Sequence, residues 1–207
     1  MKPTDEGLVK RFLEGDQNSF NLLMWRWEKP LYHFIYRMIG DQEEARDLCQ
    51  ESFLRAYRSL RGFKQKAKFS SWLYKIAINQ CHSWGRKRKR ARVISLSEIA
   101  RGDEYAPREE REGASNSPVE GNLERREREI MVRQALARLP EKQRLVIILK
   151  EYQELKFSEI ARLLRCPVST IKSRLYAGLV AMSSILASSA VQQGKSARSQ
   201  NMGGRQL

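Results

Sequence analysis

The chain has 207 residues, with 39 Lys+Arg against 24 Asp+Glu, which gives a formal net charge of +15 at pH 7. Its apolar fraction of 41% is sufficient for one or two domains with a real core. No window approaches the ~18–20 apolar residues of a membrane-spanning helix, and no apolar secretory segment follows Met1. The three cysteines, Cys49, Cys81 and Cys166, are odd in number and widely spaced, and they form no C-x-x-C motif and no plausible disulfide framework. We therefore expect a soluble cytoplasmic protein without membrane insertion.

The positive charge is concentrated in one stretch. Residues 61–92 hold 11 basic and no acidic side chains, whereas residues 1–60 have a net charge of −1 and residues 93–122 a net charge of −4. The basic block also contains several aromatic side chains, which a solvated tail does not usually hold. A block of this kind indicates a polyanionic partner, for which nucleic acid is the first candidate.

The first two predicted helices lie before residue 41. Apolar residues recur at helical spacing in the first, which is predicted to end at Gly15. Ser19 is predicted to cap the second helix, which runs to Gly40. Pro30 inside that helix predicts a kink or a break.

Two more helices are predicted in this half of the chain. Asp41 and Glu44 form an acidic capping pair that opens the third helix. After a basic loop at 61–69, Ser70 is predicted to cap the fourth. The apolar residues expected on their core sides are Leu48, Phe53, Leu54, Tyr57 and Leu60 in the third helix and Trp72, Leu73, Ile76, Ala77, Cys81 and Trp84 in the fourth.

Composition divides the rest of the chain. Residues 101–122 are rich in Gly, Pro, Ser, Asn and Glu, which indicates an extended linker. Helical periodicity returns near Leu123, and the chain after 187 is predicted to be disordered. The prediction is an all-α protein with domains at 5–92 and 123–186, a flexible acidic linker at 93–122 and a disordered tail at 187–207.

The end of the second domain has the pattern of a helix-turn-helix. Two helices at 158–164 and 167–183 are joined by a short turn at Arg165 and Cys166. The second helix has a polar face that suits the DNA major groove, although a plain helical hairpin with a solvated basic face fits the same pattern. That face consists of Ser169, Thr170, Lys172, Ser173, Arg174 and Tyr176.

Two stretches of opposite charge lie in the first domain. The block at 61–92 combines cations with aromatic rings, which suits single-stranded nucleic acid. The acidic stretch at 41–51 would be repelled by DNA. We interpret it as a docking surface for a basic protein partner, or alternatively as an ordinary exposed helix face.

Four motifs stand in order along the chain. They are DQEEARDLCQESFLRAY at 41–57, FSSWLYKIAIN at 69–79, LPEKQRLV at 139–146, and FSEIA at 157–161 followed by STIKSRLY at 169–176. Together they resemble bacterial RNA polymerase sigma factors of the extracytoplasmic-function (ECF) subfamily, over about residues 5–92 and 123–183.

The resemblance implies a protein that is not an enzyme and that gives core RNA polymerase its promoter choice. The acidic helix would bind the clamp helices of the largest polymerase subunit through Glu43, Glu44, Asp47, Gln50 and Glu51. The next helix would hold the melted non-template strand of the −10 element, with Asn79 bordering a pocket for a flipped base. The cations of this second set are Arg61, Lys64, Lys66, Lys68, Lys75 and Arg86, with the four lysines on backbone phosphates.

The resemblance also implies that the helix-turn-helix reads the −35 element as duplex DNA. It implies an anti-sigma factor as a partner, a linker that threads through the polymerase, and no cofactor or metal. The sequence departs from the family at Ala177-Gly178-Leu179-Val180, where further cations are usual, and we expect weaker or altered −35 binding. It also has Arg165 where the family commonly has Gly, which implies a strained or altered turn.

Two other functions fit part of the pattern. A stand-alone helix-turn-helix regulator would bind duplex DNA without polymerase, but it gives the acidic helix and the block at 61–92 no role. A nuclease would need clustered carboxylates with metal, or histidine, and the basic block holds no acid and only His82. Adjacent Cys81 and His82 without a second ligand pair do not make a zinc site.

Overall fold

The computed structural model describes residues 3–63, 67–99 and 123–202, and the regular elements of these residues are all helices, with no strand among them. This confirms the predicted all-α class. The chain divides into two compact units, residues 1–116 and 117–207.

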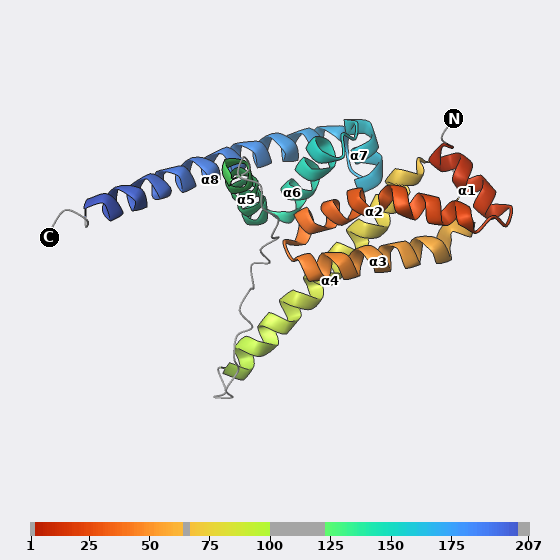
Figure 1. Ribbon diagram of the computed structural model, residues 1–207, viewed down its shortest axis with the longest axis horizontal. Helices are drawn as coiled ribbons and strands as arrows, with labels where there is room; N and C mark the ends of the chain where they lie inside the picture. Colours follow the sequence, from red (N-terminus) through yellow and green to blue (C-terminus); the bar gives the residue numbers. More distant parts are fainter. Residues whose placement is uncertain (1–2, 64–66, 100–122, 203–207) are drawn as a thin grey trace. The chain divides into compact units, whose positions relative to one another are not determined.

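The N-terminal unit is a bundle built around α2 (Figure 1). Its elements are α1 (Asp5–Leu13), α2 (Asn18–Ile39), α3 (Gln42–Ser59), the short 3-10 helix η1 (Leu60–Gly62) and α4 (Phe69–Ile99). Helix α2 packs against α1, α3 and α4, and α3 packs against α4. Leu31, Phe34 and Ile35 of α2 and Phe69 and Leu73 of α4 are fully buried in the shared core.

The helix boundaries differ in part from the predicted ones. Ser19 does not cap α2, which begins at Asn18 after Gln17. The carboxylate of Asp16 instead serves this end of the helix, because it accepts hydrogen bonds from the amide of Asn18 at 3.0 Å and the hydroxyl of Ser19 at 2.7 Å. The bond from Ser19 lowers the pKa of Asp16. Pro30 does not break α2, which continues to Ile39.

The predicted cap of α3 is confirmed, because the Asp41 carboxylate accepts a hydrogen bond from the amide of Glu44 at 3.0 Å. Helix α4 begins at Phe69, one residue before the predicted cap Ser70. It then continues to Ile99, past the predicted boundary at residue 92. Residues 100–122, most of the predicted linker, lie outside the described residues.

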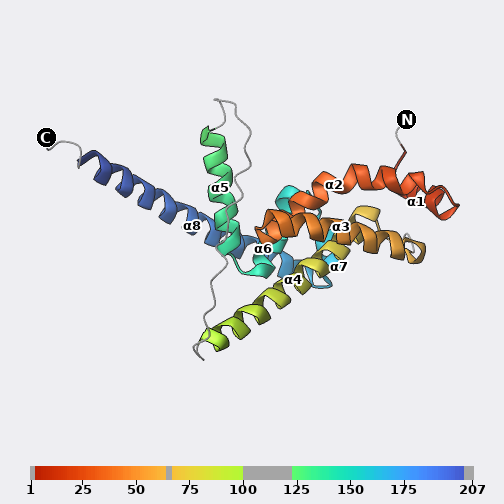
Figure 2. The same ribbon diagram turned by 60° about the horizontal axis from the view of Figure 1, so that its bottom comes forward.

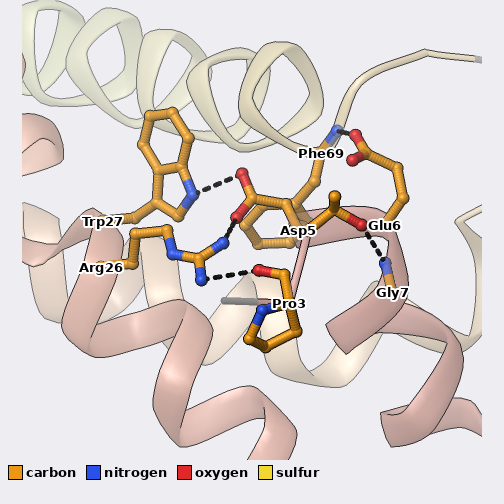
Figure 3. Close-up of polar contacts among 8 residues, drawn as sticks. Pro3, Asp5, Glu6, Gly7, Arg26, Trp27 and Phe69 are labelled. Atoms are coloured by element: carbon orange, nitrogen blue, oxygen red, sulfur yellow. Dashed lines mark hydrogen bonds and ion pairs between the residues drawn. The ribbon is translucent and has the colours of Figure 1, made fainter. Parts of the chain in front are cut away.

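Asp5 joins α1 to α2 (Figure 3). Its carboxylate accepts hydrogen bonds from the guanidinium of Arg26 and from Nε1 of Trp27, the latter at 3.0 Å. Arg26 also donates to the backbone oxygen of Pro3 at 2.9 Å. Trp27 in turn meets the buried Tyr74 of α4 edge to face, with ring centroids 5.9 Å apart. Asp5 thus fixes a ring that contacts α4.

A second carboxylate of α1 reaches the start of α4 (Figure 3). Glu6 Oε1 accepts a hydrogen bond from the amide of Phe69 at 3.3 Å. The first amides of a helix have no partner inside it, and they carry partial positive charge. Glu6 therefore satisfies one of these amides and complements the dipole of α4.

We expect Asp5→Ala to lower the free energy of unfolding of the N-terminal unit by about 2 kcal/mol, because two hydrogen bonds to a charged acceptor are lost. Urea denaturation followed by tryptophan fluorescence measures this, since all four tryptophans lie in this unit. The control is Glu14→Ala, whose exposed pair with Lys10 spans 3.9 Å and is worth less than about 0.5 kcal/mol. Equal losses in the two variants would contradict the role given to Asp5.

The C-terminal unit is organised around α8 (Figure 2). Its elements are α5 (Leu123–Arg138), α6 (Glu141–Ile147), the π-helical turn η2 (Ile148–Tyr152), α7 (Phe157–Leu164) and α8 (Val168–Met202). Helices α5, α6 and α7 each pack against α8. Helix α8 does not end near residue 187, where the sequence predicted disorder, but continues to Met202. Residues 187–202 contain no proline, the residue that most strongly stops a helix, although they include Gly194.

Gly178 lies where α8 crosses α6. A Cβ atom at this position would stand 2.8 Å from Cδ1 of Ile147 and 3.2 Å from Cβ of Gln143. Ile147 is itself buried, so it has little room to move. Glycine is therefore required by the close approach of the two helices, although it disfavours the helix itself.

We expect Gly178→Ala to destabilise the C-terminal unit by about 1 kcal/mol, because overpacking of about 1–3 kcal/mol exceeds a helix-propensity gain of about 1 kcal/mol. Gly85→Ala in α4 is the matched control: no atom lies within 4 Å of the place that its Cβ would take, so it should gain about 1 kcal/mol. Hydrogen exchange of the amides of α8 and α4 reports each effect. Stabilisation by both substitutions would show that α6 and α8 can move apart at no cost.

Candidate nucleic-acid and polymerase interfaces

Helix α3 has an acidic outer face and an apolar inner face. Its inner face buries Ala45, Cys49 and Phe53 against the rest of the bundle. Burial raises the pKa of the Cys49 thiol to about 12, so this cysteine is a core residue and not a reactive one. Four of the five predicted polymerase-binding residues are exposed and the fifth, Glu51, is half-buried; the exposed ones are Glu43, Glu44, Asp47 and Gln50.

These five side chains share one stripe of the helix, because their spacings of three, four and seven residues return to the same side. Within the stripe, Glu51 accepts a hydrogen bond from Nε of Arg55 at 2.7 Å. That bond holds the pKa of Glu51 below its usual value. Glu43, Glu44 and Asp47 take part in no ion pair within the described parts of the unit.

Leu54 continues the acidic stripe and was assigned to the wrong side by the sequence. It was predicted to face the core, but 50% of its surface is exposed, and Tyr57 is 43% exposed. Leu54 stands seven residues after Asp47 and four after Gln50, a spacing that places it on the same face. The stripe is therefore an acidic surface with an apolar residue at its end.

The region predicted to hold the −10 element begins with a cluster of aromatic rings. Phe63 and Phe69 are buried, and Trp72 packs on them with ring centroids 5.0 and 5.8 Å away. Their rings form the support on which α4 begins, so Phe63 and Phe69 do not serve as stacking platforms. Of the predicted cations, Arg61 and Lys68 are exposed beside this cluster, while Lys64 and Lys66 lie outside the described residues.

Along α4 the predicted DNA-binding residues occupy one outer face. Lys75, Asn79 and Arg86 recur at spacings of four and seven residues, opposite the buried Ala77, Ile78 and Cys81. Asn79 and Arg86 are exposed, and Lys75 is half-buried. Arg86 donates a hydrogen bond to the hydroxyl of Ser83 at 3.0 Å. Trp84, predicted in the core, is half-buried instead, and the guanidinium of Arg88 lies 5.1 Å from its ring centroid.

The turn of the helix-turn-helix contains a residue with positive φ, which agrees with the strained turn expected at Arg165. Ile160 of α7 and Ile171 of α8 are fully buried against each other's helices. Arg165, at φ 52° and ψ 49°, is left-handed and ends α7. Cys166 then donates its backbone amide to Ala161 at 3.1 Å, and Val168 begins α8.

The six predicted residues of α8 do not all share its exposed face. Thr170 and Arg174 are half-buried, and Nη1 of Arg174 donates a hydrogen bond to Sγ of Cys166 at 3.8 Å. The guanidinium of Arg174 is thus turned back toward the turn. The other four are exposed on one face: Ser169, Lys172, Ser173 and Tyr176.

Two neighbours of this face were missed by the sequence. Val180 is 72% exposed and lies one turn after Tyr176 on the same side. Lys150, from the π-helical turn, lies 5.3 Å from the ring centroid of Phe157, and Lys172 lies 5.7 Å from the same ring. A π-helical turn gives no sequence signal that would have placed Lys150 beside α8.

We expect Arg165→Gly to stabilise the C-terminal unit by about 1 kcal/mol, because glycine adopts the left-handed conformation without the steric cost of a side chain. Arg162→Gly provides the comparison: it removes the same charge from an exposed position inside α7 and should cost about 1 kcal/mol. Hydrogen exchange of α7 and α8 amides measures both. A loss of protection in Arg165→Gly would mean that the arginine side chain supports the turn.

Comparison with known proteins finds similarity in both units of the chain. The family models for sigma-70 region 2 and sigma-70 region 4 match residues 23–91 and 123–182. The chain is 34% identical to the RNA polymerase sigma-H factor of Pseudomonas aeruginosa, over 83% of this chain and 88% of that protein. It is also 34% identical to the ECF RNA polymerase sigma factor SigW of Bacillus subtilis, over 84% and 92%.

A solved structure with the same fold is the sigma factor RpoE from Bartonella quintana in complex with the anti-sigma factor NepR. It has a TM-score of 0.59 at 22% identity, and the match covers 81% of this chain and 96% of that chain. The chain therefore belongs to the sigma-70 family of RNA polymerase sigma factors, in which it is an ECF sigma factor. It directs promoter-specific initiation of transcription, as the motif resemblance implied.

Membership of this family assigns the chain to the non-catalytic initiation factors. In the described parts of the chain, no three His, Cys, Asp or Glu side chains come together as a metal site would require. No helix in those same parts has both the length and the apolar character needed to cross a bilayer.

Proposed function

We propose that the acidic stripe of α3 binds core RNA polymerase, at the clamp helices of its largest subunit, while α4 holds melted promoter. The observation that carries this proposal is the opposite charge of the exposed faces of two adjacent helices. Glu43 and Asp47 face outward on α3, and Lys75 and Arg86 are on the outer face of α4. DNA repels the first face and attracts the second, so the two faces suit different partners.

The −10 element is held, in this proposal, as a single strand along α4. Asn79 supplies an amide that can donate to and accept from the edge of one unstacked base. Arg61, Lys68 and Lys75 supply charge for the backbone on either side of it, and Lys64 and Lys66 are assigned to the same backbone by motif position. These phosphate contacts fix the register of the strand without reading its sequence.

The −35 element is read as duplex by the exposed face of α8, through Ser169, Lys172, Ser173 and Tyr176. Thr170 and Arg174 support the start of this helix from its flank. Val180 extends the face by an apolar side chain, which can contact the methyl group of thymine but no phosphate. We therefore expect a recognition helix with few charged contacts beyond Tyr176, and a −35 contribution that depends on the first two turns of α8.

Membership of the family supports the remaining parts of the function. The chain itself catalyses no reaction, needs no cofactor and works where the polymerase works, in the cytoplasm. The complex of the Bartonella sigma factor with an anti-sigma factor supports an anti-sigma factor as a further partner of this chain. The domain assignment stays as predicted in outline, with polymerase and −10 binding before the linker and −35 binding after it.

Reversing the charge of the stripe tests the proposal. The double variant Glu43→Lys and Asp47→Lys should weaken binding to core polymerase at least about 100-fold, because it sets like charges against a basic partner. Fluorescence anisotropy of labelled protein titrated with core polymerase measures this affinity.

The matched control is Glu14→Lys with Glu28→Lys, which makes the same change of charge at exposed positions outside the stripe. It should retain wild-type affinity. If the control loses as much affinity as the stripe variant, net charge and not the α3 surface governs assembly, and the assignment is wrong.

A further inference from the structure

A buried amide on α4 has no role in the proposed function. Only 5% of the surface of Gln80 is exposed, so this side chain lies within the core of the N-terminal unit. A polar group buried in this way destabilises the fold unless it forms a hydrogen bond. The partner of Gln80 therefore indicates what the residue contributes.

The partner is Glu51, on the adjacent helix α3. Helices α3 and α4 pack against each other, and the side chain of Gln80 forms a hydrogen bond with the carboxylate of Glu51. An ionised carboxylate only accepts hydrogen bonds, so the amide of Gln80 is the donor. Nε of Arg55 donates a second bond to the same carboxylate at 2.7 Å. Both bonds lower the pKa of Glu51, that from Arg55 more than that from Gln80, and thus favour its charged form.

The two donors differ in how firmly they hold the carboxylate. Arg55 stands one turn after Glu51 on the same helix, and 58% of its side chain is exposed. An exposed pair of this kind is weak and leaves both side chains mobile. Gln80 comes from another helix and is enclosed by close-packed neighbours, which restrict its side chain. Gln80 therefore fixes the carboxylate of Glu51 relative to α4, which Arg55 cannot do.

The held carboxylate is still accessible from outside. Glu51 keeps 40% of its side chain exposed. A carboxylate offers about four lone-pair sites, of which these two bonds occupy two. A cation of a binding partner can therefore approach Glu51 from the solvent side while Gln80 holds it from the core side.

Glu51 differs in this respect from the other carboxylates of the acidic stripe. Glu43, Glu44 and Asp47 form no ion pair in the described parts of the unit. Side chains that are mobile before binding lose conformational freedom when a partner orders them, and this loss weakens the complex. Because Glu51 is already held by α4, it incurs less of this loss than they do.

We propose that Gln80 is a positioning residue for polymerase binding, which holds the carboxylate of Glu51 in the orientation that meets a cation of the polymerase. This inference rests on the proposed function, because it takes the acidic stripe of α3 as the polymerase-binding surface. It also gives α4 a part in both interfaces, since the buried Gln80 directly follows the exposed Asn79.

A double-mutant cycle tests the role of Gln80. Gln80→Met keeps a side chain of similar length without the donor, and it is made in the wild type, in Glu51→Ala and in Glu43→Ala. Gln80→Leu repeats the series, so that the result does not depend on one replacement. Fluorescence anisotropy of the labelled full chain titrated with core polymerase measures each affinity, and urea denaturation verifies that each variant is folded.

The matched control is Ser52→Ala. It also removes a buried polar group, but the hydroxyl of Ser52 bonds within α3 to the backbone oxygen of Leu48, at 2.6 Å. This variant should keep the wild-type affinity for polymerase.

We expect Gln80→Met to weaken polymerase binding about three- to tenfold, which is the effect of ordering one more mobile side chain on binding. The same loss should appear in the Glu43→Ala background. No further loss should appear in Glu51→Ala, where the carboxylate that Gln80 holds is gone. A residue that only supports the fold would instead lower the affinity equally in both backgrounds.

Three results overturn the inference. They are an equal loss in the two backgrounds, a Gln80→Met variant that binds polymerase like the wild type, and a loss confined to binding of the −10 strand by the holoenzyme. The last result would mean that Gln80 acts through Asn79. If Glu43→Ala and Glu51→Ala both bind polymerase like the wild type, the acidic stripe is not the polymerase surface, and the proposed function itself is overturned.

Discussion

The burial of α3 and α4 in one apolar core is the constraint on which the N-terminal unit depends. Each helix has only one side to give to that core. Once Phe53 and Ala56 of α3 and Leu73 and Ile78 of α4 are buried, the remaining side of each helix must face solvent. The acidic stripe and the cations of α4 are thereby held on separate outer surfaces, so that they do not neutralise one another. A single packing arrangement thus serves both proposed partners.

The sequence predicted the helices of this unit well, because apolar residues recur with helical period and the Asp41 cap stands where expected. The prediction was wrong where a local pattern fits two residues or two sides of a helix equally well. Asp16 and Ser19 are both residue types that cap helices, and only the hydrogen bond from the amide of Asn18 shows that the Asp16 carboxylate serves the start of α2. Leu54 and Tyr57 fit the apolar period of the third helix, yet both are exposed. How far the core extends along a helix depends on the helices packed against it, which the period does not show. Composition likewise indicated polarity after residue 187 without excluding a helix there.

The candidate sites were predictable to a similar degree. Motif position and helical spacing located the exposed faces of α3, α4 and α8. They did not show that Arg174 turns toward Cys166, because this contact joins residues eight positions apart across a turn. They also could not place Lys150 beside Lys172, since a widened helical turn shifts the register of the residues after it. Contacts that depend on tertiary geometry have no signature in a linear pattern.

The glycine at the crossing of α6 and α8 limits how this regulator can evolve. A longer side chain at residue 178 would push α6 and α8 apart, so this position must keep its glycine even when the rest of the exposed face of α8 changes. Neighbouring Ala177 and Val180 are both solvent-facing and carry no such restriction. Substitutions along this part of α8 are therefore easiest at exposed positions such as these, on either side of an internal residue that must stay small.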